Sequence, residues 1–290
     1  YRHGRFGTQY TTRARARMFL RFLRARGIND LAKVTQQIVE AYAAEMKDNV
    51  EAGDLGVATA VNRLSAVNVV MEQIRGDSRC FVQPSRAIGR RCYVRRTPPV
   101  SLDKDQVMGV ANALMARNEN RLAVVIMLCR TFGLRFREAS LLRVKGALKQ
   151  ARRRGAIDIV KGTQGGRPRT ILVDGAQIEV LRLAVKEIGG DRCVVPADWS
   201  YIRWCRFCYR TWRRTAAEVG LTTKFSDLRA GFACEKYHEI AEVPAPVVTG
   251  GRVANRTIDR IARQAVAKEL GHAREQIAGM YVGTTIRRKS

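Results

Sequence analysis

The sequence predicts a mainly helical protein of two domains with one small antiparallel β-sheet. A chain of 290 residues is long enough for two domains with separate cores. Apolar residues recur at helical spacing along most of it, and two short alternating segments flank a glycine-rich turn. The pair Pro98–Pro99 interrupts the helical pattern. We therefore expect a helical domain at residues 1–95, a linker at 96–100 and a second domain at 101–290.

The first domain should contain three helices. One begins after Thr11–Thr12, which can cap it, and the others span about residues 35–48 and 57–74. No acidic residue lies between Tyr10 and Asn29, so the basic side of the first helix lacks a neutralising partner within the helix. We expect that side to follow DNA phosphates rather than to be a merely solvated face. Its arginines are Arg13, Arg17, Arg21 and Arg24.

The connector between the two domains is basic. It spans residues 86–99 and ends in the proline pair, which can neither continue a helix nor donate to a sheet. A connector of this kind is suited to crossing a DNA backbone between two domains. The arginines expected to bind DNA here are Arg90, Arg91, Arg95 and Arg96.

The second domain should open with a helix that Ser101 caps and that runs to Leu114. Residues 157–160 and 169–173 alternate like strands and should form a hairpin around the glycine-rich segment 161–168.

Later helices are expected at residues 176–187 and 198–219, and a loop at 243–255. In the helix at 198–219 we expect one apolar stripe to face the core rather than to stack on bases. The stripe consists of Ile202, Cys205, Tyr209, Trp212 and Ala216.

The charge balance indicates a polyanionic partner. Lys and Arg number 53 against 26 Asp and Glu, which gives a formal net charge of +27. Such an excess repels itself in a compact fold unless a polyanion neutralises it. A basic protein that merely stays soluble, or an RNA-binding protein, would have a similar composition. We expect nucleic acid as the partner.

Neither a membrane nor a metal is expected. The chain has no run of about eighteen apolar residues, so nothing should span a bilayer. Its cysteines are odd in number and scattered, which indicates reduced thiols in the cytoplasm. Cys205-x-x-Cys208 could bind zinc with Cys193 and Cys234, but it lies within a helical pattern and neither outer cysteine belongs to a second such pair. We expect no metal and no cofactor.

Four polar residues of the second domain lie in motifs with a common chemistry. Arg135 follows Gly133-Leu134 and precedes Glu138 by one helical turn, and Arg229 ends Asp227-Leu228-Arg229. His272 ends Leu270-Gly271-His272, and Tyr281 follows nine residues later.

These motifs resemble those of the tyrosine recombinases, the phage-integrase family of site-specific DNA recombinases. The resemblance covers nearly the whole chain and implies a helical, SAM-like core-binding domain followed by an α+β catalytic domain. Residues 2–4 (Arg-His-Gly) and 249–251 (Thr-Gly-Gly) are similar to a branch found on integrative mobile elements.

The resemblance implies a role for each residue. Arg135 and Arg229 would stabilise the charge that develops on the phosphate oxygens, a task that suits the planar, always protonated guanidinium. His272 would hydrogen-bond the scissile phosphate, and Tyr281 would attack it to leave a 3′-phosphotyrosyl bond. Glu138 would orient the local structure. The plainer alternatives are structural salt bridges for the arginines and a capped core histidine.

Two positions depart from the family pattern. Ser226 stands where the family has a histidine, and a serine cannot act as a base near neutral pH. The family also uses a hairpin lysine to protonate the leaving 5′-oxygen, and Gln164 takes that place here. Lys161 lies three residues earlier, so we expect it to be the acid. Arg167 and Arg169, on the same side of the hairpin, are expected to contact DNA.

The sequence therefore predicts a site-specific DNA recombinase for integration, excision or inversion of a DNA element. By the family resemblance it would act as a homotetramer on paired double-stranded sites, with accessory DNA-bending or directionality factors as possible partners, in the cytoplasm at the bacterial nucleoid. Two rival functions remain open: a DNA-binding protein of the same fold with impaired catalysis, and a DNA-relaxing enzyme like the type IB topoisomerases. A plain RNA-binding protein would explain the charge but not the four motif residues.

Overall fold

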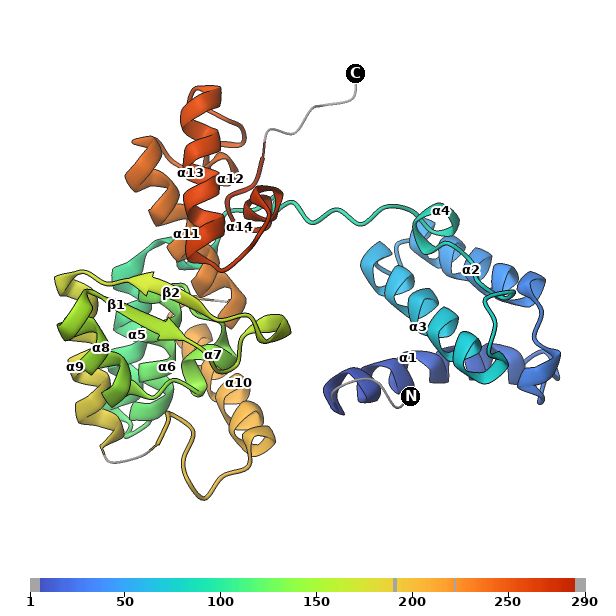
Figure 1. The fold of residues 1–290 in the computed structure, drawn as a ribbon, viewed down its shortest axis with the longest axis horizontal. Coiled ribbons are helices and arrows are strands. Elements are labelled where there is room, and N and C mark those ends of the chain that lie inside the picture. The colour runs from blue at the N-terminus through green and yellow to red at the C-terminus, as the bar shows by residue number, and fades with distance from the viewer. Residues whose placement is uncertain (1–5, 190–191, 222, 285–290) are drawn as a thin grey trace. The chain divides into compact units, whose positions relative to one another are not determined.

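The computed structural model describes residues 6–189, 192–221 and 223–284 (Figure 1). It divides into two compact units, Tyr1–Cys92 and Tyr93–Ser290. The expectation of a mainly helical protein with a small antiparallel sheet is confirmed. Within the described ranges, no helix has both the length and the apolar character needed to cross a membrane. The mobile-element motif at residues 2–4 lies outside the described part of the chain.

In the described part of the N-terminal unit, the α-helices are α1 (Phe6–Arg24), α2 (Gln36–Glu51), α3 (Val57–Arg75) and the short α4 (Pro84–Ala87), with one turn of 3-10 helix, η1 (Leu31–Lys33), between α1 and α2. Its core gathers apolar side chains spaced along the helices, and the Phe19, Phe22 and Tyr42 rings pack 5.0 to 6.0 Å apart. Thr11–Thr12 lies inside α1, so the predicted cap is wrong, because the helix begins at Phe6.

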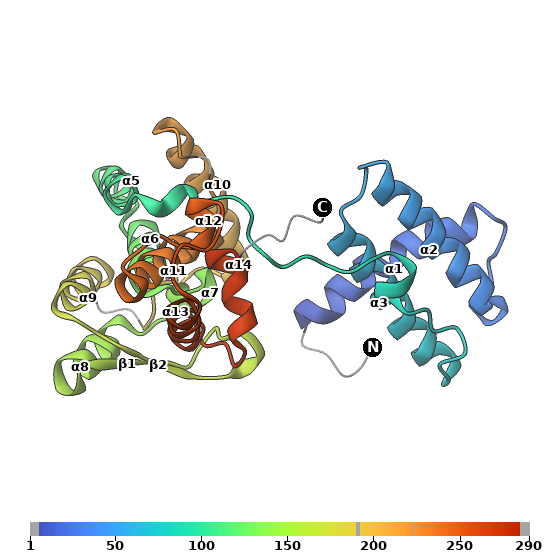
Figure 2. The ribbon, with the colours of Figure 1, turned by 90° about the horizontal axis from the view of Figure 1, so that it is seen from above.

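The first part of the C-terminal unit surrounds one central helix. Its helices are α5 (Lys104–Ala116), α6 (Asn120–Phe132), α7 (Phe136–Ser140), α8 (Val144–Arg154) and α9 (Gly175–Ile188). Helix α6 is buried from Leu122 to Phe132 because α5, α9 and a later helix, α11 (Phe225–Ala241), pack around it (Figure 2). This explains the continuous apolar run in the sequence.

The sheet is a two-stranded hairpin. Strands β1 (Ala156–Ile159) and β2 (Arg169–Leu172) pair antiparallel, with Ala156 opposite Leu172 and Ile159 opposite Arg169. A single turn of 3-10 helix, η3 (Gln164–Gly166), lies in the connection. The hairpin thus forms as the alternation predicts.

The last part of the chain contains the helices that carry Arg229 and Tyr281. Helices α10 (Tyr201–Glu218) and α11 are followed by α12 (Pro246–Thr249), α13 (Arg256–Glu269) and the four-residue helix α14 (Gly279–Val282). Helix α11 packs against both α13 and α14 (Figure 1).

Three local expectations for the second unit differ from the structure. Asp103, not Ser101, caps α5, because its side chain accepts a hydrogen bond from the Gln106 N–H. The stripe expected on α10 is only partly buried: Trp212 and Ala216 lie in the core as predicted, but Ile202 and Tyr209 are 65% and 46% exposed. Trp204, outside the predicted stripe, is buried. The predicted loop at 243–255 contains the short helix α12.

Candidate active site

The carboxylate of Glu138 lies at the centre of the site. It comes from α7, whose first turn it closes by accepting the Arg135 N–H at 2.8 Å. Its other oxygen accepts from the Arg135 guanidinium, also at 2.8 Å, and the Glu138 side chain is fully buried. The Arg135 side chain is 23% exposed, so it can still donate to an incoming oxyanion.

Arg169, on β2, also binds Glu138. Its two terminal nitrogens each donate to one carboxylate oxygen at 2.7 Å, which is the bidentate geometry that favours arginine. Gly271 makes room for this side chain, because a Cβ added there would lie 2.7 Å from Arg169 Cδ. The Arg169 side chain is 7% exposed. It is therefore part of the site, and its predicted contact with DNA would be made from within the arginine cluster.

Arg229, on α11, is the third cation of the cluster. It donates to the backbone carbonyls of Gly133 and Leu270, and its Nε lies 3.3 Å from the Tyr281 hydroxyl. It is 2% exposed, and its charge lies 3.7 Å from the Glu138 carboxylate. These contacts fix the guanidinium plane and leave some of its N–H groups for an oxyanion.

His272 and Tyr281 meet beside Arg229. The Nε2 atom of His272 is 3.2 Å from the Tyr281 hydroxyl, and the two rings are 5.7 Å apart. The histidine follows Gly271, whose φ of 70° ends α13 in the left-handed region. The tyrosine lies on α14, so two separate segments place the two side chains together. The structure thus brings Arg135, Arg229, His272 and Tyr281 into one cluster.

The charges of the cluster set its protonation. Burial alone would raise the pKa of Glu138, but Arg169, the Arg135 N–H and the Arg229 charge lower it to about 2. Burial lowers the pKa of Arg229 to about 10, so it stays protonated at pH 7. Burial, together with the neighbouring arginine charges, lowers the pKa of His272 to about 4, so its imidazole is neutral. Three guanidinium charges against one carboxylate leave a cationic site suited to a phosphodiester.

Two predicted residues, Ser226 and Lys161, form no hydrogen bond or ion pair with this cluster among the described contacts. Ser226 is exposed near the start of α11 and makes no hydrogen bond to Tyr281 among the described contacts. Lys161 is exposed just after β1 and borders a hollow that Glu138 also lines. Gly162 packs against the start of α7, where an added Cβ would lie 2.7 Å from the Arg137 carbonyl oxygen. Gln164 is exposed in η3.

Most of the arginines expected to bind DNA are exposed. Those with exposed side chains are Arg13, Arg17, Arg21, Arg24, Arg90, Arg96 and Arg167. Arg91 is half-buried. Arg95 is different, because its guanidinium pairs with the Asp227 carboxylate and its side chain is 21% exposed. That ion pair takes Arg95 out of the exposed basic surface.

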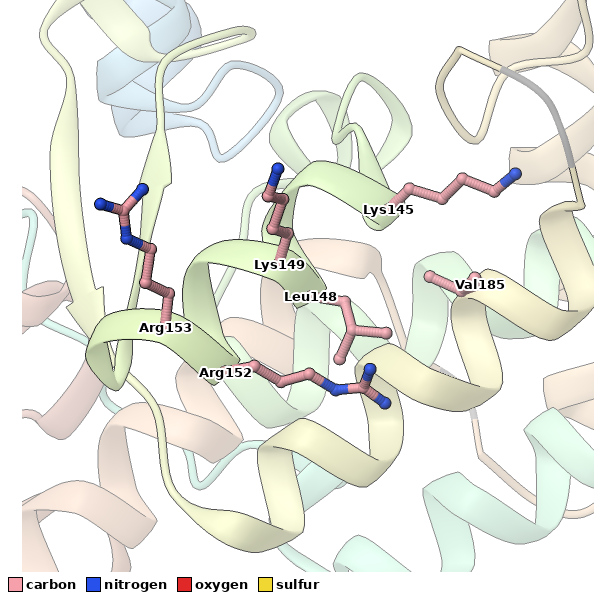
Figure 3. Close-up of a pocket in the computed structure, with 6 residues that line it drawn as sticks. All are labelled: Lys145, Leu148, Lys149, Arg152, Arg153 and Val185. Atoms are coloured by element: carbon pink, nitrogen blue, oxygen red, sulfur yellow. The ribbon is translucent and has the colours of Figure 1, made fainter.

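Two further basic faces were missed in the sequence. One lies on α10 and comprises Arg203, Arg206, Arg210 and Arg213, all exposed. Their spacing of three or four residues places them on one side of a helix, and this spacing is visible in the sequence. The other lies on α8, where Lys145, Lys149, Arg152 and Arg153 extend around Leu148, and Val185 of α9 lies beside them (Figure 3).

The cysteines contribute no metal centre within the described residues, where no group of three or more potential ligands is placed to hold an ion. Burial raises the pKa of Cys205 and of Cys208, which favours neutral thiols over the thiolates that zinc needs.

Fold and sequence comparisons agree on the class of protein. Residues 100–235 match the family model described as Integrase. A lambda integrase dimer bound to a COC′ core site is similar over 100% of this chain and 93% of that chain, at 15% identity and a TM-score of 0.61. The Tn1549 transposon integrase bound to transposon right end DNA matches over 98% and 92%, at 14% identity and a TM-score of 0.61.

A lambda integrase tetramer bound to a Holliday junction is similar over 100% of this chain and 76% of that chain, at 16% identity and a TM-score of 0.57. No curated protein matches the sequence. The fold is that of the tyrosine recombinases. Residues 100–235 of this chain are similar to the integrase family, and the fold of the whole chain is similar to that of lambda integrase and Tn1549 integrase.

Proposed function

We propose that this protein is a site-specific DNA recombinase that cleaves and rejoins strands through a 3′-phosphotyrosyl bond to Tyr281. The observation that carries the proposal is the pair of contacts at the Tyr281 hydroxyl, 3.2 Å from His272 Nε2 and 3.3 Å from Arg229 Nε. A tyrosine with only a structural role would not need a cationic cluster beside its hydroxyl. This one lies next to three arginines held by one carboxylate.

In the proposed cleavage, the Tyr281 oxygen attacks the phosphorus and the bond to the 5′-oxygen breaks. Arg135 and Arg229 stabilise the charge on the non-bridging oxygens, and His272 donates a hydrogen bond to one of them. The ester energy stays in the phosphotyrosyl bond, so rejoining by the 5′-hydroxyl needs no ATP. Glu138 and Arg169 keep the arginines in place.

The phenolic proton has a short path away from Tyr281. Ser226 offers no base, so we assign the phenolic proton to Nε2 of the neutral His272, 3.2 Å from the hydroxyl; the imidazolium that forms then donates it as a hydrogen bond to a non-bridging phosphate oxygen. Arg229 Nε, 3.3 Å from the same oxygen, can donate a hydrogen bond to it as the proton leaves. We therefore assign the step that the family histidine would assist to the His272 and Arg229 pair.

The leaving 5′-oxygen needs a proton, and we assign it to Lys161. The lysine lies on the hairpin beside α7, whose Glu138 lines the same hollow. Replacing Lys161 with alanine should slow cleavage strongly, and a 5′-thiol leaving group, which needs no acid, should restore the rate. An unchanged rate on the normal substrate would remove Lys161 from the mechanism.

The partner in this proposal is double-stranded DNA, bound as a tetramer on paired sites. Its support is the net charge of +27, the exposed arginines of α1 and α10, and matched structures that are complexes with DNA, one of them a tetramer on a Holliday junction. Integration, excision and inversion all use this chemistry and differ only in how the sites are arranged.

A suicide-substrate assay tests the proposal. Nicked DNA from the ends of the element that encodes the protein is incubated with wild type and Tyr281→Phe, and the products are separated on a denaturing gel. A covalent protein–DNA band in wild type alone supports the recombinase. Tight binding without a band favours the second candidate, a DNA-binding protein with impaired catalysis, for which Ser226 and Gln164 argue. Relaxation of a plasmid without the site would indicate a topoisomerase.

A further inference from the structure

Tyr281 lies on a helix too short to hold itself in place. Helix α14 has four residues, and a single turn has little stability of its own in water. Its position must therefore come from contacts with the rest of the unit. On one side, the Arg263 guanidinium donates to the Gly283 carbonyl at 2.7 Å, and the Cys234 thiol lies 3.8 Å from the Tyr281 carbonyl.

A further contact with α14 comes from the segment of residues 93–101, which we call the strap. The Arg95 N–H donates to the carbonyl of Gly279, the first residue of α14, at 2.9 Å. Val94 packs on the same glycine, where an added Cβ would lie 3.9 Å from Val94 Cγ2. The strap thus contacts the turn that carries Tyr281, two residues before the tyrosine.

The strap is itself fixed to α11. The Arg95 guanidinium pairs with one Asp227 oxygen, and the other oxygen accepts the Ser101 N–H at 3.0 Å. The Ser101 hydroxyl donates to the Asp227 carbonyl at 2.7 Å. Gly231 is required beneath it, because an added Cβ would lie 2.5 Å from the Ser101 carbonyl oxygen. The Asp227 carboxylate therefore binds both Arg95 and Ser101, so residues 95–101 are held at both ends by the helix that carries Arg229.

From these contacts we infer that Arg95 is a positioning residue for Tyr281. Its backbone holds the tyrosine turn, and its side chain ties that turn to Asp227, two residues before Arg229. The distance between nucleophile and phosphate-binding arginine then depends on the strap. Asp227, for which the sequence predicts no role, is the residue to which the strap binds. The inference rests on the proposed function for its catalytic consequence, but not for the contact itself.

The test uses the full-length protein and the variants Arg95→Ala, Arg95→Lys and Asp227→Asn. Arg182→Ala is the matched control, because Arg182 forms an exposed ion pair with Glu179 elsewhere in the same unit. Three quantities are measured: the rate of covalent adduct formation at saturating DNA, the DNA affinity, and hydrogen exchange of the amides at 95 and 279–283. Exchange of the buried α6 serves as the internal reference for global stability.

Arg95→Ala should slow adduct formation by about tenfold or more, since small displacements of a reacting group are costly. Its DNA affinity should stay within about twofold of wild type. The amides at 95 and 279–283 should exchange faster while α6 does not. Arg95→Lys, which can keep one ion pair with Asp227, should recover part of the rate, and Arg182→Ala should match wild type. Asp227→Asn, which keeps an acceptor but loses the charge, should resemble Arg95→Ala in direction.

Two results would overturn the inference. The first is unchanged exchange at 279–283 in Arg95→Ala. The second is weaker DNA binding with a normal rate at saturation, which would make Arg95 a DNA contact. If wild type itself forms no adduct, the proposed function fails, and the exchange data alone decide whether the strap holds α14. If Arg95→Ala does not fold, Arg95→Lys and Asp227→Asn carry the comparison.

Discussion

At the scale of single residues, one buried carboxylate organises the site. Glu138 accepts hydrogen bonds from Arg135 and Arg169 and lies 3.7 Å from Arg229. Without it, three like charges would face one another with little water to screen them. The cost of burying the carboxylate is offset by two charge-assisted partners and one backbone N–H.

Removing the charge of Glu138 should therefore destabilise the protein. We expect Glu138→Gln to lower the free energy of unfolding by roughly 3–5 kcal/mol at pH 7, the usual range for breaking a buried ion pair. Urea unfolding measures this change. Glu179→Gln, which removes an exposed pair with Arg182, should cost less than about 1 kcal/mol. Equal losses in the two variants would contradict a central role for Glu138.

The titration of His272 follows from the same charges. Its pKa is lowered to about 4 in the folded protein, below the value near 6.5 of an ordinary histidine. The unfolded chain then binds more protons between pH 6.5 and pH 4, so this group favours folding above pH 6.5 and loses that contribution as the pH falls.

Nuclear magnetic resonance can follow the His272 ring from pH 8 to pH 5, with His272→Gln to assign its signal among the three histidines. We expect the His272 ring of the free protein not to titrate in that range. DNA with an intact phosphate at the cleavage position should raise the midpoint, because a nearby anion favours the protonated ring. A midpoint near 6.5 without DNA would contradict the buried, cation-flanked environment.

At the scale of the elements, close packing holds the short segments of the site in place. Helix α7 has five residues, yet a capping box and the tight approach of Gly162 hold it. Gly133 has a φ of 59°, and an added Cβ would lie 2.4 Å from the Phe232 ring. These glycines let the hairpin, α7 and α11 approach closely enough for Arg169 and Arg229 to share one carboxylate.

The exposed face of α10 should bind DNA. Replacing Arg203, Arg206 and Arg210 with glutamine removes three cations that have no ion pair among the described contacts. If each contacts one phosphate, the slope of log affinity against log salt should become less steep by about 2–3. Fluorescence anisotropy at several salt concentrations measures this slope. Arg182→Gln, on α9, should leave it unchanged, and an unchanged slope in the triple variant would exclude α10 from the interface.

At the scale of the whole molecule, charge and connectivity act together. Each of the two units has its own apolar core, and a single basic segment joins them. A net charge of +27 that no internal set of acids can balance favours long-range attraction to DNA by both units.

The connector should contribute to binding through its charge. Replacing Arg90, Arg91 and Arg96 together with glutamine should lower DNA affinity and make the salt slope less steep by about 2–3. The rate of cleavage at saturating DNA should change little. This outcome is the opposite of the one expected for Arg95→Ala, although all four arginines lie within seven residues. The same change in cleavage rate and salt slope in both variants would show that Arg95 has the same role as the other three arginines.

The local sequence pattern by itself determined much of the secondary structure of this protein. The helical period and the hairpin alternation can be read from the chain, because each depends on residues close together in it. Arg135, Arg229, His272 and Tyr281 are far apart in the sequence, and the resemblance of their short motifs to those of the tyrosine recombinases is what grouped them. The orienting role of Glu138 is likewise implied by the resemblance, whereas its place one turn from Arg135 predicts only the ion pair between them.

Only the tertiary structure decided which distant partners the charged residues meet. Arg169 reaches Glu138 across 31 residues, and Arg95 reaches Asp227 across 132, so neither pairing leaves a periodic trace in the sequence. The face of α10 that is buried was likewise misjudged, because Trp204 and Tyr209 are equally compatible with an inward stripe until their neighbours are known. A long-range ion pair is fixed by packing, and packing is a property of the whole fold.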